Sequence, residues 1–385
     1  MKKIFISGIG VILFGFAIST MLFAGGKQAS DSKDDIVIGA TIPVTGDYAI
    51  AGLRITQAAS LAVKEINDAG GVLGKKLRLQ IEDSQAQSDR DIQMINKLAS
   101  DGAVGIIGPY FSTNTVAVAD TLKSNGILCI AGVNSPTVRA LNSPWIFRAR
   151  SSDSINLQIL VKATLDGGAK KPAVLCVNDE FGTVAGNIIR RDLEKARVPF
   201  YFEGHNPMDM DMSTTLAKSV AEGCDAYIIV TQNNGAVIIA RQMYEMGIKK
   251  PVYGSGIFAV NDVLVMMEPE WVEGWRVMCD FSYLDERSLQ KGFTERFRKA
   301  YNDVPDLIAA MYYGAIQVLA DAIKRAGSTD RAAIRNALAK TEGLEIPVGT
   351  VMATADEYTD MIFEIAMAEI RNCTPVIIQS VSLLK

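Results

Sequence analysis

Two serines stand where a predicted strand gives way to a predicted helix. Ser112 follows the strand expected at 104–107 and opens the helix expected at 112–123. Ser135 stands directly before Pro136, and proline is preferred at the first position of a helix. Free backbone N–H groups and the positive end of the helix dipole attract an anion there, and a hydroxyl adds a donor. The two serines therefore predict an anion-binding site, with simple helix capping as the alternative.

Groups suited to other chemistry are scarce. His205 is the sole histidine, and a lone histidine in a polar stretch does not make a Ser–His–Asp arrangement. The sequence has no phosphate-binding P-loop, and Gly254-Ser255-Gly256 lacks the spacing of a nucleophile elbow. Asp209 and Asp211 alternate with methionines outside any EF-hand pattern. We therefore expect a binding protein that is not an enzyme and that carries no metal or cofactor.

The elements that would position these residues alternate between strand and helix. Repeated βα units of this length predict parallel sheets with right-handed crossovers, and 385 residues suffice for two α/β domains. Ligand contacts then fall at the carboxyl ends of the strands. Strands are expected at 36–40, 77–81, 104–107, 127–130, 173–177, 200–202, 226–230, 252–253, 361–370 and 376–383. Helices are expected at 49–69, 88–100, 112–123, 183–196, 213–221 and 236–246, and the region 286–338 is strongly helical.

The first 26 residues have the pattern of an export signal. Two lysines precede an apolar run from Ile4 to Phe23, and the small residues Ala24-Gly25-Gly26 suit a signal peptidase. An uncleaved membrane anchor is the alternative, because the run is nearly long enough to span a bilayer. No cysteine precedes Cys129, so we expect a periplasmic protein that is not a lipoprotein. No later segment is expected to be long and apolar enough to cross a membrane.

Charge and cysteine content argue against two further classes. The formal net charge is −4 and no basic stripe is present, so we expect no nucleic-acid partner. The five cysteines are widely spaced and form no zinc pattern. Their odd number leaves at least one thiol unpaired within the chain, and we expect no intramolecular disulfide.

Four stretches, taken together, are typical of one family. They are Gly39–Gly46, Ala62–Gly74, Ile106–Pro109 and Asp179–Gly182. On these stretches the chain resembles the periplasmic leucine/isoleucine/valine-binding proteins, which are type I solute-binding proteins of ABC importers. The resemblance extends from Ile36 to about Leu384.

The resemblance implies an α/β fold of two Rossmann-like lobes with doubly wound parallel sheets, joined by three hinge strands. Carried onto this chain, lobe one comprises 34–152 plus 282–358, and lobe two comprises 153–281 plus 359–385; residues 1–26 are the signal peptide. The implied function is capture of a small-molecule ligand between the lobes and its delivery to the permease subunits of an ABC importer. A monomer is the family's usual state, and a branched-chain or other apolar amino acid is the leading ligand class.

The resemblance also assigns ligand contacts in the first lobe. Ser112 and Ser135 match the positions whose hydroxyls hold the ligand carboxylate. Val133 matches the position whose backbone carbonyl accepts a hydrogen bond from the ligand ammonium.

In the second lobe, Phe181 matches an aromatic residue that covers the ligand, and packing at a helix start is its alternative role. Gln232 and Asn233 stand where the family often has an aromatic or polar contact.

Gly256 is a departure from the family, because it stands where an acid commonly binds the ligand ammonium. A buried ammonium without an anionic partner is costly. Asp179, Glu180 and Asp262 are the candidates to supply the missing charge. The alternatives are therefore a small carboxylate or amide without an ammonium group, and a ligand-sensing ectodomain, since one fold serves both transport and sensing.

Overall fold

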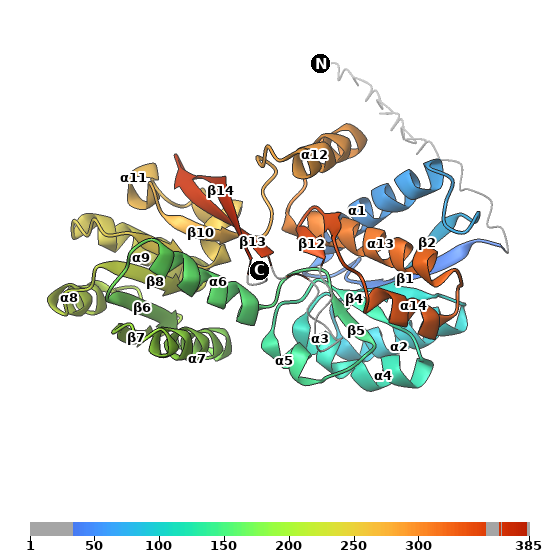
Figure 1. Ribbon diagram of the computed structural model, residues 1–385, viewed down its shortest axis with the longest axis horizontal. Helices are drawn as coiled ribbons and strands as arrows, with labels where there is room; N and C mark the ends of the chain where they lie inside the picture. The colour runs from blue at the N-terminus through green and yellow to red at the C-terminus, as the bar shows by residue number, and fades with distance from the viewer. Residues whose placement is uncertain (1–33, 352–361, 363, 383–385) are drawn as a thin grey trace, which may run out of the picture. The chain divides into compact units, whose positions relative to one another are not determined.

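The computed structural model describes residues 34–351, 362 and 364–382 (Figure 1). The export signal predicted at 1–26 lies outside these residues, as do the outer ends of the strands predicted at 361–370 and 376–383. Most strands belong to two sheets, and a separate pair comprises β11 (Leu344–Ile346) and β12 (Gly349–Val351).

The first sheet is wholly parallel and has the strand order β2–β1–β3–β4–β5. Alternate side chains of β1 face opposite sides, so Ile38 joins the core with α1 and α13, and Val37 joins a second cluster with α2. The strands are β1 (Ile36–Ile42), β2 (Leu77–Asp83), β3 (Gly105–Ile107), β4 (Cys129–Ala131) and β5 (Ile146–Arg148). The helices that follow them are α1 (Ala49–Asp68), α2 (Ser88–Ser100), α3 (Ser112–Ala117), α4 (Ala119–Asn125) and α5 (Pro136–Ala140).

The second sheet has the order β14–β13–β10–β9–β8–β6–β7 and is parallel except at β13, which is antiparallel to both neighbours. Leu175 and Cys176 of β6 face opposite clusters, so this sheet is also covered on both sides. The strands are β6 (Pro172–Val177), β7 (Tyr201–His205), β8 (Ala226–Val230), β9 (Val252–Gly254), β10 (Arg276–Cys279), β13 (Glu364–Arg371) and β14 (Thr374–Ser382). The associated helices are α6 (Asp153–Asp166), α7 (Glu180–Lys195), α8 (Ser213–Ala221), α9 (Asn233–Glu245), α10 (Asn261–Leu264) and α11 (Pro269–Val272), with a 3₁₀ turn at Gly256–Ala259.

Three helices near the C-terminus pack with the first sheet: α12 (Ser288–Tyr301), α13 (Leu307–Ala326) and α14 (Arg331–Leu338). The expectation that no later segment has the length and apolarity of a membrane span was wrong for α13. However, 72% of its most apolar window is buried inside the protein, and Tyr312 and Ile316 are fully inaccessible. Its apolarity is therefore that of a central core helix.

The predicted alternation of strands and helices is confirmed, and α2, α8 and β8 have the predicted bounds. The helix predicted at 112–123 is instead two helices, α3 and α4, separated at Val118. The Asn114 amide of α3 donates to the buried carboxylate of Asp91 in α2 at 2.6 Å, which fixes α3 against α2 independently of α4.

The chain passes three times between the elements of the first sheet and those of the second. The first crossing is 149–152, between β5 and α6, and the second is 280–287, between β10 and α12. The third, between β12 and β13, lies mostly outside the described residues. The lobe boundaries given above remain a prediction.

Candidate functional site

A cavity of about 820 Å³ lies at the carboxyl ends of β8, β9 and β10, next to the first turn of α6. Its wall includes residues of both crossing segments that the structure describes, together with Ile50 and Arg54 of α1 and the start of α13. Cavities of several hundred cubic ångströms are the usual size for small-molecule sites, and carboxyl strand ends are their usual place in α/β proteins.

Two buried hydroxyl groups line this cavity without a hydrogen-bond partner. Thr231 follows β8 and Ser255 follows β9, and their relative exposures are 1% and 3%. Neither hydroxyl oxygen has a partner within the described part of the chain. Leaving a buried polar group unsatisfied costs about 1–3 kcal/mol. These hydroxyls are thus placed to bond a polar ligand or ordered water.

Three residues predicted from the resemblance also line the cavity. Phe181 packs against the core on one side, Gln232 directly precedes α9, and Gly256 follows Ser255. The side chain of the fourth, Asn233, lies outside the described part of the structure, and only its place at the start of α9 is given.

Asp179, one of the acids considered as a substitute at Gly256, has another role. Its Oδ1 accepts from the backbone N–H of Gly182 at 2.7 Å, which caps α7. Its Oδ2 accepts from the side-chain amide of Gln232 at 3.0 Å. Asp179 therefore orients a cavity residue but does not itself line the cavity. The side chains of Glu180 and Asp262, the other two candidates, lie outside the described part.

The predicted contacts of the first lobe do not line this cavity, although their neighbour Asn134 does. Ser135 is the N-cap of α5, as its position before proline predicts, and its hydroxyl lies 2.7 Å from that of Thr137. Ser112 is half-buried at the first position of α3, and Val133 is buried in the core. Their roles in binding remain predictions.

The charged groups of the cavity were not found from the sequence. Arg150 lies on the first crossing segment and Asp280 on the second, and the two side chains form an ion pair. Their side-chain exposures are 17% and 8%, and the Arg150 Nε has no hydrogen-bond partner among the described residues. These residues were missed because β5 and β10, the short strands that precede them, were not predicted.

A second acid, Asp153, begins α6 beside this ion pair. It accepts from the Asn134 amide at 2.9 Å. Burial raises the pKa of Asp153 to about 6; the nearby guanidinium of Arg150 opposes this shift and the carboxylate of Asp280 adds to it.

Apolar side chains complete the cavity wall. They come from α1, α6, the turn after β9 and the second crossing segment, and include Ile50, Leu157, Ile257, Phe281 and Tyr283. The wall therefore offers both charged groups and a large apolar surface.

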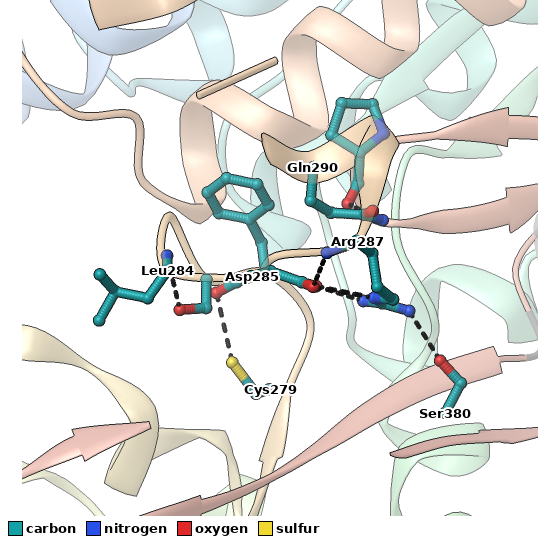
Figure 2. A network of polar contacts seen from close by, with 9 residues as sticks. Cys279, Leu284, Asp285, Arg287, Gln290 and Ser380 are labelled. Atoms are coloured by element: carbon teal, nitrogen blue, oxygen red, sulfur yellow. Dashed lines mark hydrogen bonds and ion pairs between the residues drawn. The ribbon is translucent and has the colours of Figure 1, made fainter. Parts of the chain in front are cut away.

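A polar network fixes the second crossing segment, as Figure 2 shows. Two guanidinium nitrogens of Arg287, Nε and Nη2, donate to Asp285 at 2.8 and 2.6 Å, and Nη1 donates to the Ser380 hydroxyl of β14 at 2.7 Å. The side chain of Gln290 donates to the Pro347 carbonyl at 3.3 Å. Because Asp285 is buried, these bonds connect the segment that carries Asp280 firmly to β14.

The chain forms two sheets flanked by helices and crosses between them three times. A cavity with apolar and charged walls lies at the strand ends. These features define a small-molecule binding protein of the type I fold. The family model for periplasmic binding proteins matches residues 35–373. The chain therefore belongs to the periplasmic binding protein family, whose members act outside the cytoplasm in solute transport.

Comparison with individual proteins gives matches of the same class. A Leu/Ile/Val-binding protein homolog from Brucella abortus is 29% identical over 332 residues, which are 84% of this chain and 86% of that protein. A branched-chain amino acid ABC transporter ligand-binding protein from Burkholderia xenovorans is similar in structure, with a TM-score of 0.80 at 16% identity, over 90% of this chain and 96% of that chain. The LivJ substrate-binding protein from Streptococcus pneumoniae, in complex with isoleucine, has a TM-score of 0.71 at 23% identity, over 89% and 99%. The two structural matches show the shared fold.

Proposed function

We propose that this protein captures a branched-chain or other apolar amino acid for an ABC importer. The observation that carries the proposal is one cavity in which buried, unpartnered polar groups lie beside a broad apolar wall. An apolar amino acid has matching parts, a zwitterionic head group and a hydrocarbon side chain. The similarity to Leu/Ile/Val-binding proteins supports the same ligand class.

The wider role follows from this proposal. The protein would be exported to the periplasm by a signal peptide at 1–26, without lipid modification, and would act as a monomer with no catalytic activity. It would deliver its ligand to the permease subunits of the importer. The proposed lobes, 34–152 plus 282–358 and 153–281 plus 359–385, would close around the ligand. Closure would bring Ser112, Val133 and Ser135 to a ligand already in contact with Phe181, Gln232 and Asn233.

A thermal-shift screen tests the ligand class. L-leucine, L-isoleucine or L-valine should raise the unfolding temperature, because a ligand at 100 times its Kd stabilises the native state by about 2.7 kcal/mol. The corresponding 2-keto acids and simple amides should give smaller shifts. Stabilisation by keto acids alone would contradict the proposal and favour a small carboxylate as ligand. No response to any of these compounds would leave a sensing or other binding role.

Alanine substitution tests the two serines. Ser112→Ala and Ser135→Ala should each weaken binding of the best amino acid about 10-fold, which is the effect of one hydrogen bond to a charged group. Calorimetry is the measurement. Ser124→Ala is the control, because the Ser124 hydroxyl bonds the Thr121 carbonyl on the exposed side of α4. Unchanged affinity in both variants would remove these residues from the site.

A further inference from the structure

The ion pair between Arg150 and Asp280 has no evident stabilising purpose. Both side chains are largely buried, and taking two charges out of water costs as much as or more than their mutual attraction returns. One guanidinium nitrogen of Arg150 donates to Oδ2 of Asp280, while its Nε has no partner among the described residues. Oδ1 is the second acceptor oxygen of Asp280, and a carboxylate can accept several hydrogen bonds. Both residues therefore keep bonding capacity in the wall of the cavity.

Asp280 follows β10, the strand next to β9, and Gly256 follows β9 at the position where the family commonly has an acid. Strands β9 and β10 are parallel neighbours, with Gly254 opposite Val277. A Cβ built on Gly256 would meet only the Met278 carbonyl, at 3.8 Å, so the space beside this glycine is open. Asp280 follows Met278 by two residues and lines the same cavity. The neighbouring strand end thus supplies a carboxylate to the cavity that Gly256 also lines.

Two further acceptors lie close by on α6. Asp153 and Asn156 are three residues apart, so they share one face of its first turns. Both line the cavity, and the Oδ1 of Asn156 is buried without a partner in the described chain. Asp280, Asp153 and Asn156 together offer three acceptors, which is the number of N–H donors on an ammonium group.

The two carboxylates of this cluster favour a cation. Asp153 and Asp280 contribute two negative charges, and Arg150 and Arg148, which both act on Asp153, contribute two positive charges. The two carboxylates repel each other, and this repulsion adds to the burial that raises the pKa of Asp153. An ammonium placed between them would remove this repulsion.

We propose that Asp280, with Asp153 and Asn156, binds the ammonium group of the ligand, and that Arg150 is the positioning residue that orients Asp280. This inference rests on the amino-acid function proposed above, and it names the residues that replace the missing acid at Gly256.

The test compares three probes on the wild type and on Asp280→Asn, which keeps the shape of the side chain. The probes are the tightest binder among L-leucine, L-isoleucine and L-valine, its 2-keto acid, and its decarboxylated amine. The variant should lose at least about 30-fold in affinity for the amino acid, the scale for truncating one partner of a buried charge pair. The amine should lose affinity similarly, while the keto acid should change by less than about 3-fold.

Asp166→Asn is the matched control, because Asp166 is an exposed acid at the end of α6 that pairs with Lys162. It should leave all three affinities unchanged. Should Asp280→Asn fail to fold by circular dichroism, Asp153→Asn carries the same comparison, with an expected loss of about 10-fold for the amino acid and the amine but not for the keto acid.

The possible results separate the two proposals. Unchanged amino-acid affinity in a folded Asp280→Asn variant, or an equal loss for amino acid and keto acid, would overturn the ammonium site and leave the proposed function standing. Failure of the wild type to bind leucine, isoleucine, valine or any other apolar amino acid would overturn the proposed function itself.

Discussion

The double substitution Thr231→Val and Ser255→Ala is expected to weaken ligand binding by about 100-fold and to raise the unfolding temperature of the ligand-free protein. Each hydroxyl is buried in the cavity wall without a partner among the described residues. Two hydrogen bonds to a charged head group are worth about 3 kcal/mol or more together, and contributions from separate sites add approximately. Without ligand the same hydroxyls lower the stability of the native state, and replacing them with an apolar group of similar shape is neutral or stabilising.

Calorimetry and thermal unfolding of the same samples measure both effects. Thr164→Val is the matched control, since Thr164 is equally buried but its hydroxyl donates to the Leu160 carbonyl at 2.8 Å. This control should lose about 1 kcal/mol of stability and keep its ligand affinity. If the double variant behaved like the control, with lower stability and unchanged affinity, the two hydroxyls would have no part in binding.

Gly182→Ala is expected to destabilise the protein by about 2–3 kcal/mol, the cost of strong overpacking. Gly182 lies in the first turn of α7, where an added Cβ would stand 1.8 Å from the backbone oxygen of Val177 at the end of β6. Backbone cannot move aside as a flexible side chain can, so the helix start must shift. Because Phe181 precedes this glycine and lines the cavity, ligand affinity should fall as well.

Gly292→Ala provides the comparison for this prediction. Gly292 lies within α12, and its added Cβ would meet only the Nη1 of Arg296, the far end of a long side chain, at 3.1 Å. Alanine should therefore stabilise this helix by about 0.5–1 kcal/mol. Denaturant unfolding measures both variants, and equal stabilities would show that the contact with Val177 is relieved at little cost.

The fold was largely predictable because its strands are buried and its surface helices are amphipathic. The helix α6 was missed for a physical reason. It is buried on most sides, including Ile155, Leu157 and Ile159, so it lacks the one-sided period that reveals a helix in sequence. The strands β5 and β10 were missed because three or four residues carry too little pattern.

The site was only partly predictable. The family resemblance led to Phe181, Gln232 and Gly256, which line the cavity. Arg150 and Asp280 come from crossing segments whose mutual approach depends on the whole fold, and no spacing along the chain relates them. Asp179 could be identified as a nearby acid, but its bond to Gln232, with a sequence separation of 53 residues, depends on the whole fold.

Each of the two sheets packs together residues that are far apart in the sequence, which affects folding during synthesis and export. The core of the first sheet combines residues before Ala149 with residues after Phe281, and the second sheet combines β6–β10 with β13 and β14. A nascent chain that has emerged only as far as β10 therefore lacks α13 for the first core and two strands for the second. Contacts of such long sequence separation form slowly. A polypeptide translocated in an unfolded state would thus complete these two units only when almost all of it has emerged.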